Sequence, residues 1–185
     1  NILQYPVCLF GTIRAGCTVV NVNPLYTARE LQHQLNDSGA EVLVVVENFA
    51  KTVAEVVGTT KVRQVVLTSI GELLGVKGIL VDFVLRNVKK MIPAYALPGA
   101  IRLRDALAGG RGRKLERVPL THDDIAFLQY TGGTTGVAKG AMLLHRNIVA
   151  NMLQARAWLA PALDHERREI IITPLPLYHI FSLTA

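Results

Sequence analysis

The sequence has few aromatic residues, few cysteines and no long apolar run. Aromatic residues make up only 6% of the chain, although 50% of its residues are hydrophobic. The apolar content is therefore mostly valine, leucine, isoleucine and alanine, a composition typical of buried sheets and the helices that cover them. The two cysteines, Cys8 and Cys17, have no metal-ligand spacing and no further cysteines to pair with, which argues against a disulfide framework.

No apolar stretch approaches the roughly 18 uninterrupted residues of a membrane-spanning helix. The opening residues, Asn1 to Gln4, also lack the charged head of a secretory signal peptide. These absences exclude a wholly embedded membrane protein. Together with the composition, they predict a soluble protein of the cytoplasm.

Helical and strand patterns alternate along the chain. Thr27 and Glu30 have the spacing of a capping box at a helix start, and Gly39 follows where that helix is expected to end. The apolar runs Val42–Val46 and Gln64–Thr68 are typical of strands. Because strands that alternate with helices usually pair in parallel, we expect an α/β fold of layered, mostly parallel sheets flanked by helices.

The most informative segment runs from Tyr130 to Gly140 and reads YTGGTTGVAKG. It holds four glycines, three threonines and one lysine. Glycine lets consecutive backbone N–H groups turn toward an anion without a Cβ in the way, and hydroxyl and ammonium groups complete such a site. The composition therefore predicts a loop that surrounds a polyphosphate. A plain glycine-rich turn between two strands is the alternative.

The residue order distinguishes this loop from two common nucleotide loops. A Walker A loop needs Gly-Lys followed by Ser or Thr and then a helix, whereas Lys139 lies between Ala138 and Gly140. The dinucleotide fingerprint also opens a helix. Here the flanking residues 124–130 and 141–144 are both strand-like, so we expect a flap between two strands and a helix only from about Arg146.

The loop resembles the signature of the AMP-forming acyl-adenylating enzymes, which is close to YTSGTTGxPKG. This chain departs from that signature at Gly132, usually Ser or Thr, and at Ala138, usually Pro. With these departures the segment is similar to the bacterial long-chain fatty-acid–CoA ligase branch. Residues 21–27, 34–39 and 176–181 resemble the same branch, so the resemblance spans essentially the whole chain.

The resemblance implies an AMP-forming long-chain fatty-acid–CoA ligase that uses ATP, Mg²⁺ and coenzyme A. A fatty-acid carboxylate attacks the α-phosphate of ATP to give acyl-adenylate and pyrophosphate, and the thiol of coenzyme A then displaces AMP. The loop would stabilise the β- and γ-phosphates as the leaving group gains charge. The implied nucleotide-binding residues are Thr131, Gly132, Gly133, Thr134, Thr135, Gly136 and Lys139.

Three residues receive individual roles from the resemblance. Lys139 is expected to act in catalysis, and Thr131 to hold Mg²⁺ together with an acidic residue beyond this chain. His179 is expected to act in catalysis as well, because the family residue at this place borders the acyl pocket and the adenylation centre. For His179, a hydrogen-bonded loop histidine near the core stays an equal alternative.

We expect the chain to be an internal piece of the large N-terminal domain of an acyl-adenylating enzyme. Residues 1–75 would form strand and helix units, 76–117 a basic insertion and 118–185 the phosphate-loop region. The adenine and ribose contacts, the hinge and the C-terminal domain would lie elsewhere in the longer protein, so this piece alone is expected to be inactive. Two alternatives stay open: another acyl- or aryl-adenylating ligase, and a non-catalytic module that binds a lipid surface or a protein.

Positive charge is concentrated between Val76 and Arg117. This segment holds ten Lys or Arg against three Asp or Glu, a net charge of +7, whereas the whole chain carries +6. Residues 79–92 mix bulky apolar side chains with cations, as a helix that lies on an anionic membrane would. The alternative is an insertion whose apolar side packs on the same chain and whose lysines are solvated.

The expected partners follow from these features. They are a long-chain fatty acid and the inner face of the cytoplasmic membrane, with peripheral contact through the segment from Ile79 to Arg117. Nucleic acid is not expected, because no binding motif or aromatic platform accompanies the charge. Whether the protein forms a homodimer is left open.

Overall fold

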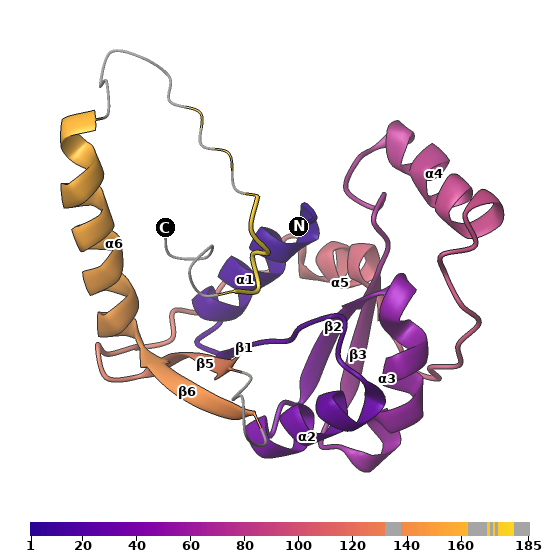
Figure 1. The fold of residues 1–185 in the computed structure, drawn as a ribbon, viewed down its shortest axis with the longest axis horizontal. Coiled ribbons are helices and arrows are strands. Elements are labelled where there is room, and N and C mark those ends of the chain that lie inside the picture. The colour runs from indigo at the N-terminus through magenta and orange to yellow at the C-terminus, as the bar shows by residue number, and fades with distance from the viewer. Residues whose placement is uncertain (132–137, 163–169, 171, 173, 180–185) are drawn as a thin grey trace. The chain divides into compact units, whose positions relative to one another are not determined.

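The computed structural model describes residues 1–131, 138–162, 170, 172 and 174–179. The chain divides into two compact units (Figure 1). The first unit consists of Asn1, Leu9–Asn21 and Arg117–Ala185, and the second of Ile2–Cys8 and Val22–Glu116. Each unit contains one three-stranded sheet, so the predicted α/β class is confirmed.

The sheet of the second unit is entirely parallel. Its strands are β2 (Val42–Val46), β3 (Gln64–Thr68) and β4 (Ile101–Arg102), in that order. The bounds of β2 and β3 coincide with the two predicted strands. Helix α3 (Ala50–Val56) connects β2 to β3 after a short 3₁₀ turn, η1 (Glu47–Phe49), and a second turn, η2 (Val57–Thr59), follows it.

Helix α2 (Ala28–Ser38) precedes this sheet and begins and ends as the sequence predicts. The backbone N–H of Thr27 donates to Glu30 Oε2 at 2.8 Å, and the Glu30 N–H donates to the Thr27 hydroxyl at 3.4 Å. Gly39 ends the helix with a left-handed φ of 66°, which glycine adopts without steric penalty. The Thr27 hydroxyl, and then its N–H, also hold the pKa of Glu30 below its ordinary value.

A hydrophobic core lies between these helices and one face of the β2–β3–β4 sheet. Leu43 and Val65 are register partners, and Leu67 follows two residues later, so all three point to the same face. They pack with buried residues of α2 and α3. The whole cluster is Leu31, Leu35, Leu43, Ala50, Val53, Val56, Val65 and Leu67.

The basic segment of this unit folds differently from the prediction. A single helix over residues 79–92 is wrong: α4 (Val76–Phe83) starts earlier and passes into a short π-helix, η3 (Val84–Val88). Lys90 has a φ of 51°, which lies outside the right-handed helical region. The helix therefore cannot continue through this residue. After β4 the segment continues as α5 (Leu103–Gly110).

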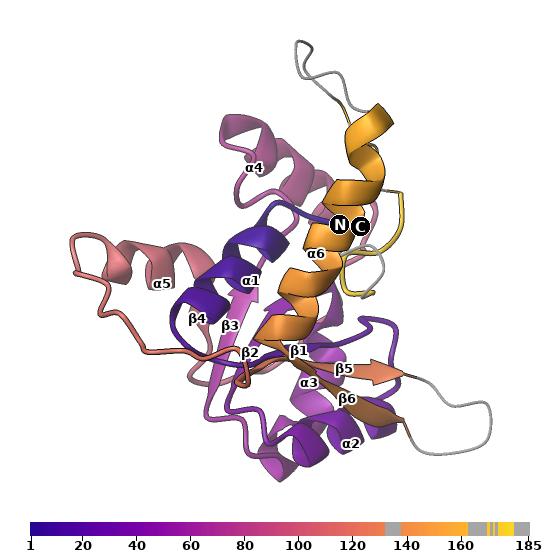
Figure 2. The same cartoon turned by 90° about the vertical axis from the view of Figure 1, so that its left-hand side faces the viewer.

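The first unit has a mixed sheet. β1 (Val19–Asn21) pairs in parallel with β5 (Ile125–Thr131), and β5 pairs antiparallel with β6 (Lys139–Leu144). Helix α6 (His145–Leu159) continues directly from β6, and a 3₁₀ turn, η4 (Ala160–Ala162), ends it (Figure 2).

The remaining helix, α1 (Gln4–Arg14), begins in the second unit and ends in the first. Among the helices in the described part of the chain, none is long and apolar enough to cross a membrane.

Candidate functional site

The glycine- and threonine-rich loop connects the two strands of a β-hairpin. Thr131, the last residue of β5, is the register partner of Lys139, the first residue of β6, and both are exposed. The predicted flap between two strands is therefore confirmed at both of its ends. The other predicted phosphate-binding residues lie outside the described residues; they are Gly132, Gly133, Thr134, Thr135 and Gly136.

No helix follows the loop directly, because β6 comes first and α6 begins at His145. The helix start is held by backbone groups: the N–H of His145 donates to the carbonyl of Asp124 at 3.0 Å. The N–H of Leu144 donates to Asn147 Oδ1 at 2.9 Å. A helix dipole aimed at the loop, as in a Walker A site, is thus not part of this arrangement.

Gly140 has a packing role that the sequence did not disclose. It lies opposite Tyr130 in the hairpin, and the Tyr130 ring is buried. A Cβ on Gly140 would lie 2.9 Å from Cε2 of that ring. A side chain at position 140 would therefore force the Tyr130 ring to shift.

Gln129 ties this hairpin to the segment that carries His179. Its side chain is buried, accepts from Asn21 Nδ2 at 3.2 Å and donates to the backbone carbonyl of Tyr178 at 3.3 Å. Strand alternation puts Gln129 on the same face of β5 as Thr131. Gln129 is not among the predicted site residues, although a polar residue in the middle of an otherwise apolar strand is a usable signal.

Further hydrogen bonds fix the backbone before His179. The N–H of Leu177 donates to Asn1 Oδ1 at 2.8 Å, and Asn1 Nδ2 donates to the carbonyl of Leu175 at 2.9 Å. The His179 N–H donates to the Pro176 carbonyl at 3.0 Å, and the residue itself is exposed. The structure thus joins Thr131 and Lys139 as strand partners and ties the residue before His179 to the same strand.

The opposite end of β5 is held by an acidic turn. The backbone N–H and the hydroxyl of Thr121 both donate to Asp124 Oδ2, at 2.5 and 2.9 Å. These two hydrogen bonds, the backbone one first, lower the pKa of the Asp124 carboxyl. The turn therefore keeps its negative charge and fixes the chain just before β5 begins.

The donors for a metal ion at the hairpin are few. Across residues 1–131 and 138–162 and the described remainder, no group of three or more His, Cys, Asp or Glu could hold a metal ion. Mg²⁺, however, usually keeps several waters and takes substrate phosphates with only one or two protein ligands. One exposed hydroxyl, that of Thr131, suits an ion that arrives with a nucleotide.

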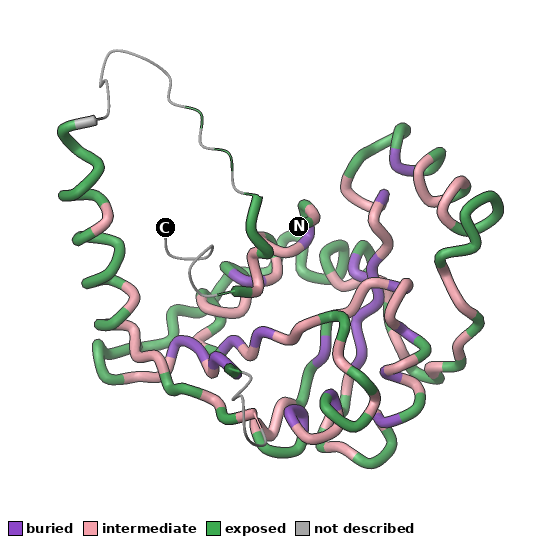
Figure 3. The backbone as a smooth tube through the Cα atoms, in the orientation of Figure 1, coloured by how far each residue is buried: buried purple, intermediate pink, exposed green. Residues whose placement is uncertain are grey.

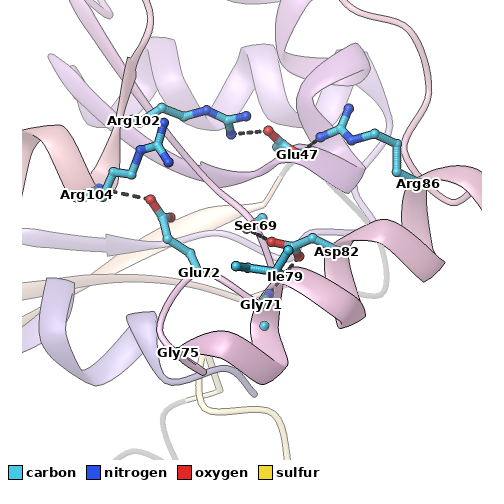
Figure 4. A pocket seen from close by; sticks show the side chains of 11 residues that line it. Glu47, Ser69, Gly71, Glu72, Gly75, Ile79, Asp82, Arg86, Arg102 and Arg104 are labelled. Carbon is cyan, nitrogen blue, oxygen red and sulfur yellow. Dashed lines mark hydrogen bonds and ion pairs between the residues drawn. The ribbon is translucent and has the colours of Figure 1, made fainter.

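The second unit has a polar pocket of about 240 Å³ that contains none of the predicted site residues. Several of its charged side chains pair with one another or accept hydrogen bonds within the pocket wall (Figure 4). Arg86 from η3 and Arg102 from β4 both pair with Glu47, whose side chain is fully buried. Tyr95 Oη donates to Glu47 at 3.3 Å, and burial, then the Glu47 carboxylate, raises the pKa of Tyr95.

Two more carboxylates of this pocket also accept hydrogen bonds from neighbouring groups. Glu72 accepts from the Thr68 hydroxyl and from the backbone N–H of Arg104, the latter at 2.9 Å. Asp82 accepts from Ser69 Oγ at 2.5 Å and from the Gly71 N–H at 2.8 Å. The charged side chains that line the pocket therefore form a structural network, which joins α4, η3 and β4 to β3.

The fold and the hairpin define an α/β protein with a phosphate-loop signature between two strands. The model of the family that is described as "AMP-binding enzyme" matches residues 1–185, so the chain belongs to that family. The predicted family membership is thereby confirmed.

Two curated relatives show which members of this family the chain is similar to. The chain is 57% identical over 185 residues to a long-chain-fatty-acid–CoA ligase of Escherichia coli O157:H7, covering 100% of this chain and 33% of that protein. The corresponding ligase of Haemophilus influenzae is 54% identical over 187 residues, with the same coverage. The chain thus spans about a third of the length of the curated relatives it matches.

A solved structure gives the same result for the fold. The crystal structure of a long-chain-fatty-acid–CoA ligase from Archaeoglobus fulgidus superposes with a TM-score of 0.72 at 29% identity, covering 100% of this chain and 30% of that one.

Proposed function

We propose that the longer protein to which this chain belongs is an AMP-forming long-chain fatty-acid–CoA ligase. The observation that carries this proposal is the 57% identity to the Escherichia coli ligase, which extends over all 185 residues. In the first step the fatty-acid carboxylate attacks the α-phosphate of ATP, which forms acyl-adenylate and releases pyrophosphate. In the second step the thiol of coenzyme A attacks the acyl carbon, and AMP leaves.

The hairpin acts on the pyrophosphate side of the first step. Lys139 supports this role because it is exposed at the loop end of the hairpin, opposite Thr131. A cation there stabilises the negative charge that grows on the leaving phosphates. This stabilisation is stronger in the transition state than in the ground state, so it lowers the activation free energy. The glycines of the loop would add backbone N–H donors.

Mg²⁺ and His179 complete the proposed site. The Thr131 hydroxyl is the protein ligand that this chain offers to Mg²⁺, which neutralises phosphate charge when it is bound. His179 borders the acyl side of the site, and the hydrogen bond from Gln129 to Tyr178 supports this assignment because it ties that segment to β5.

The substrate also suggests where the enzyme works. A long-chain fatty acid partitions into membranes, so a ligase gains from peripheral contact with the inner face of the cytoplasmic membrane. The net charge of +7 between Val76 and Arg117 supports such contact, because the lipids of that face are anionic.

The test is palmitate-dependent exchange of pyrophosphate into ATP by the full-length protein, with the 185-residue piece assayed beside it. We expect exchange by the full-length protein alone. Exchange with aromatic acids but not with palmitate would assign the protein to another acyl-adenylating ligase. No exchange with short, long or aromatic acids would refute an adenylating function.

A further inference from the structure

Asp82 in α4 and Arg86 in η3 turn toward their own unit. Asp82 accepts hydrogen bonds from Ser69 Oγ and from the Gly71 N–H, at 2.5 and 2.8 Å. Arg86, four residues later and so on the same helix face, pairs with the buried Glu47 (Figure 4). The inward face of this helix is therefore a charged one.

A backbone contact fixes which way the helix faces. Gly78 is buried, and a Cβ on it would lie 1.8 Å from the carbonyl oxygen of Gly71. A Cβ on Gly71 would in turn lie 2.2 Å from the Gly78 carbonyl oxygen. Because the two backbones touch, any rotation of α4 would drive a side chain into the loop, so the opposite face stays outward.

The outward face carries large apolar side chains. Val76, Leu80 and Phe83 follow one another at helical spacing and are 85%, 66% and 57% exposed. Val88 in η3 is exposed as well, and most of this segment is coloured as exposed in Figure 3. A helix on a protein surface normally points its apolar face inward. Within the second unit the apolar side of this segment is therefore exposed.

The side chains around this face are cationic. Lys77 at the start of α4 and Lys89 and Lys90 after η3 are all exposed. A partner that matches the face must offer an apolar interior beneath a negatively charged surface. An anionic lipid bilayer has both properties, since apolar side chains enter the boundary of the acyl chains while lysines meet the headgroups.

We propose that Val76, Leu80, Phe83 and Val88, bordered by the three lysines, form a docking surface for an anionic lipid bilayer. This docking surface deepens the proposed function, because a ligase of long-chain acids would take its substrate from the bilayer. The charge network of Glu47, Asp82 and Arg86 has a positioning role: it holds the docking surface outward.

The experiment is flotation of the full-length protein with vesicles of phosphatidylethanolamine and phosphatidylglycerol, compared with vesicles of phosphatidylcholine alone. One variant, Leu80→Gln with Phe83→Gln, removes apolar contact. A second, Lys89→Gln with Lys90→Asn, removes charge; asparagine accepts the left-handed backbone of position 90. The matched controls in the same unit are Leu25→Gln and Lys51→Gln with Lys61→Gln, all at exposed positions.

We expect the wild type to float with the anionic vesicles only. The charge variant should lose about 25-fold in partitioning, because each lysine near an anionic surface contributes roughly fivefold. The apolar variant should lose at least as much, and the controls less than twofold. Added salt should weaken the flotation of the wild type more than that of the charge variant, which keeps Lys77.

Three outcomes would overturn the proposal: no flotation of the wild type, equal flotation of the wild type and both variants, or a change of oligomeric state or melting temperature in the apolar variant without lipid. The last would show that protein covers the face, either a second copy or another part of the chain. Octanoate adenylation without vesicles is measured in parallel. Failure of the wild type with octanoate and also with palmitate would refute the proposed ligase. Wild-type protein that does not float but keeps normal octanoate activity would overturn the docking surface alone.

Discussion

The β2–β3–β4 sheet and the β5–β6 hairpin are stabilised in different ways. The first is covered on one face by α2 and α3, with an apolar cluster that includes Leu35 and Val53. In the second, neither β6 nor α6 has a buried residue. The hairpin instead depends on individual contacts, those of Gln129 and the passage of the Tyr130 ring beside Gly140. A substitution in the first region should therefore change stability, and one in the second should change activity.

The largest expected effect is that of Leu35→Ala, which removes a side chain that is 1% exposed. We expect a loss of about 4 kcal/mol in the free energy of opening of the second unit, from lost burial and the cavity left behind. Hydrogen exchange of the β2 and β3 amides in the full-length protein measures this quantity. Activity per folded molecule should not change. Leu25→Ala, at an exposed position, is the control, and equal protection in both variants would contradict the packing described for α2.

Lys139→Ala should have the opposite effect: it should lower activity and leave stability unchanged. We expect about a 100-fold loss in the rate of adenylation, the size seen when one donor to a developing anion is removed. Amide exchange in the hairpin should stay as in the wild type, because the Lys139 side chain is exposed. Single-turnover pyrophosphate release gives the rate, and Lys51→Ala is the matched control. An unchanged rate would show that Lys139 does not act on the phosphates.

Gln129→Leu tests the contact between β5 and the His179 segment. Leucine leaves the Asn21 amide and the Tyr178 carbonyl without this partner. We therefore expect the free energy of local unfolding of the His179 segment to fall by about 2 kcal/mol. If the segment borders the acyl pocket, KM for palmitate should rise about fivefold and KM for ATP less than twofold. Gln154→Leu, exposed on α6, is the control. An equal rise in both KM values would argue that the segment does not serve the acyl side.

The smallest expected effect is that of Thr27→Ala at the start of α2. Loss of the capping hydroxyl should lower the stability of the second unit by about 1 kcal/mol, with no change in activity. Thr27→Ser keeps the oxygen and should be nearly neutral. Amide exchange at Glu30 and Leu31 reads out both variants. If serine were as destabilising as alanine, the threonine methyl group and not the hydroxyl would be the important part.

The features that the sequence predicted are those encoded by neighbouring residues. The bounds of β2 and β3, the capping box of Thr27 and the strand on each side of the loop all follow from local periodicity or spacing. The charge network was not predictable, because Glu47 meets Arg86 and Arg102 only after β2, β3 and β4 have paired. The inward face of α4 was not predictable for a related reason: it is set by Gly71, which precedes the helix and is not part of its pattern.

The register of Thr131 with Lys139 separates two kinds of sequence change in the hairpin. Residues inserted between these partners lengthen the connection but leave each strand residue opposite its old neighbour. A single residue lost from β6 instead reverses its alternation, so that Lys139 would move to the other face of the sheet and Gly140 would no longer meet Tyr130. The strand pairing thus tolerates a change in loop length, whereas it does not tolerate a change in the phase of β6.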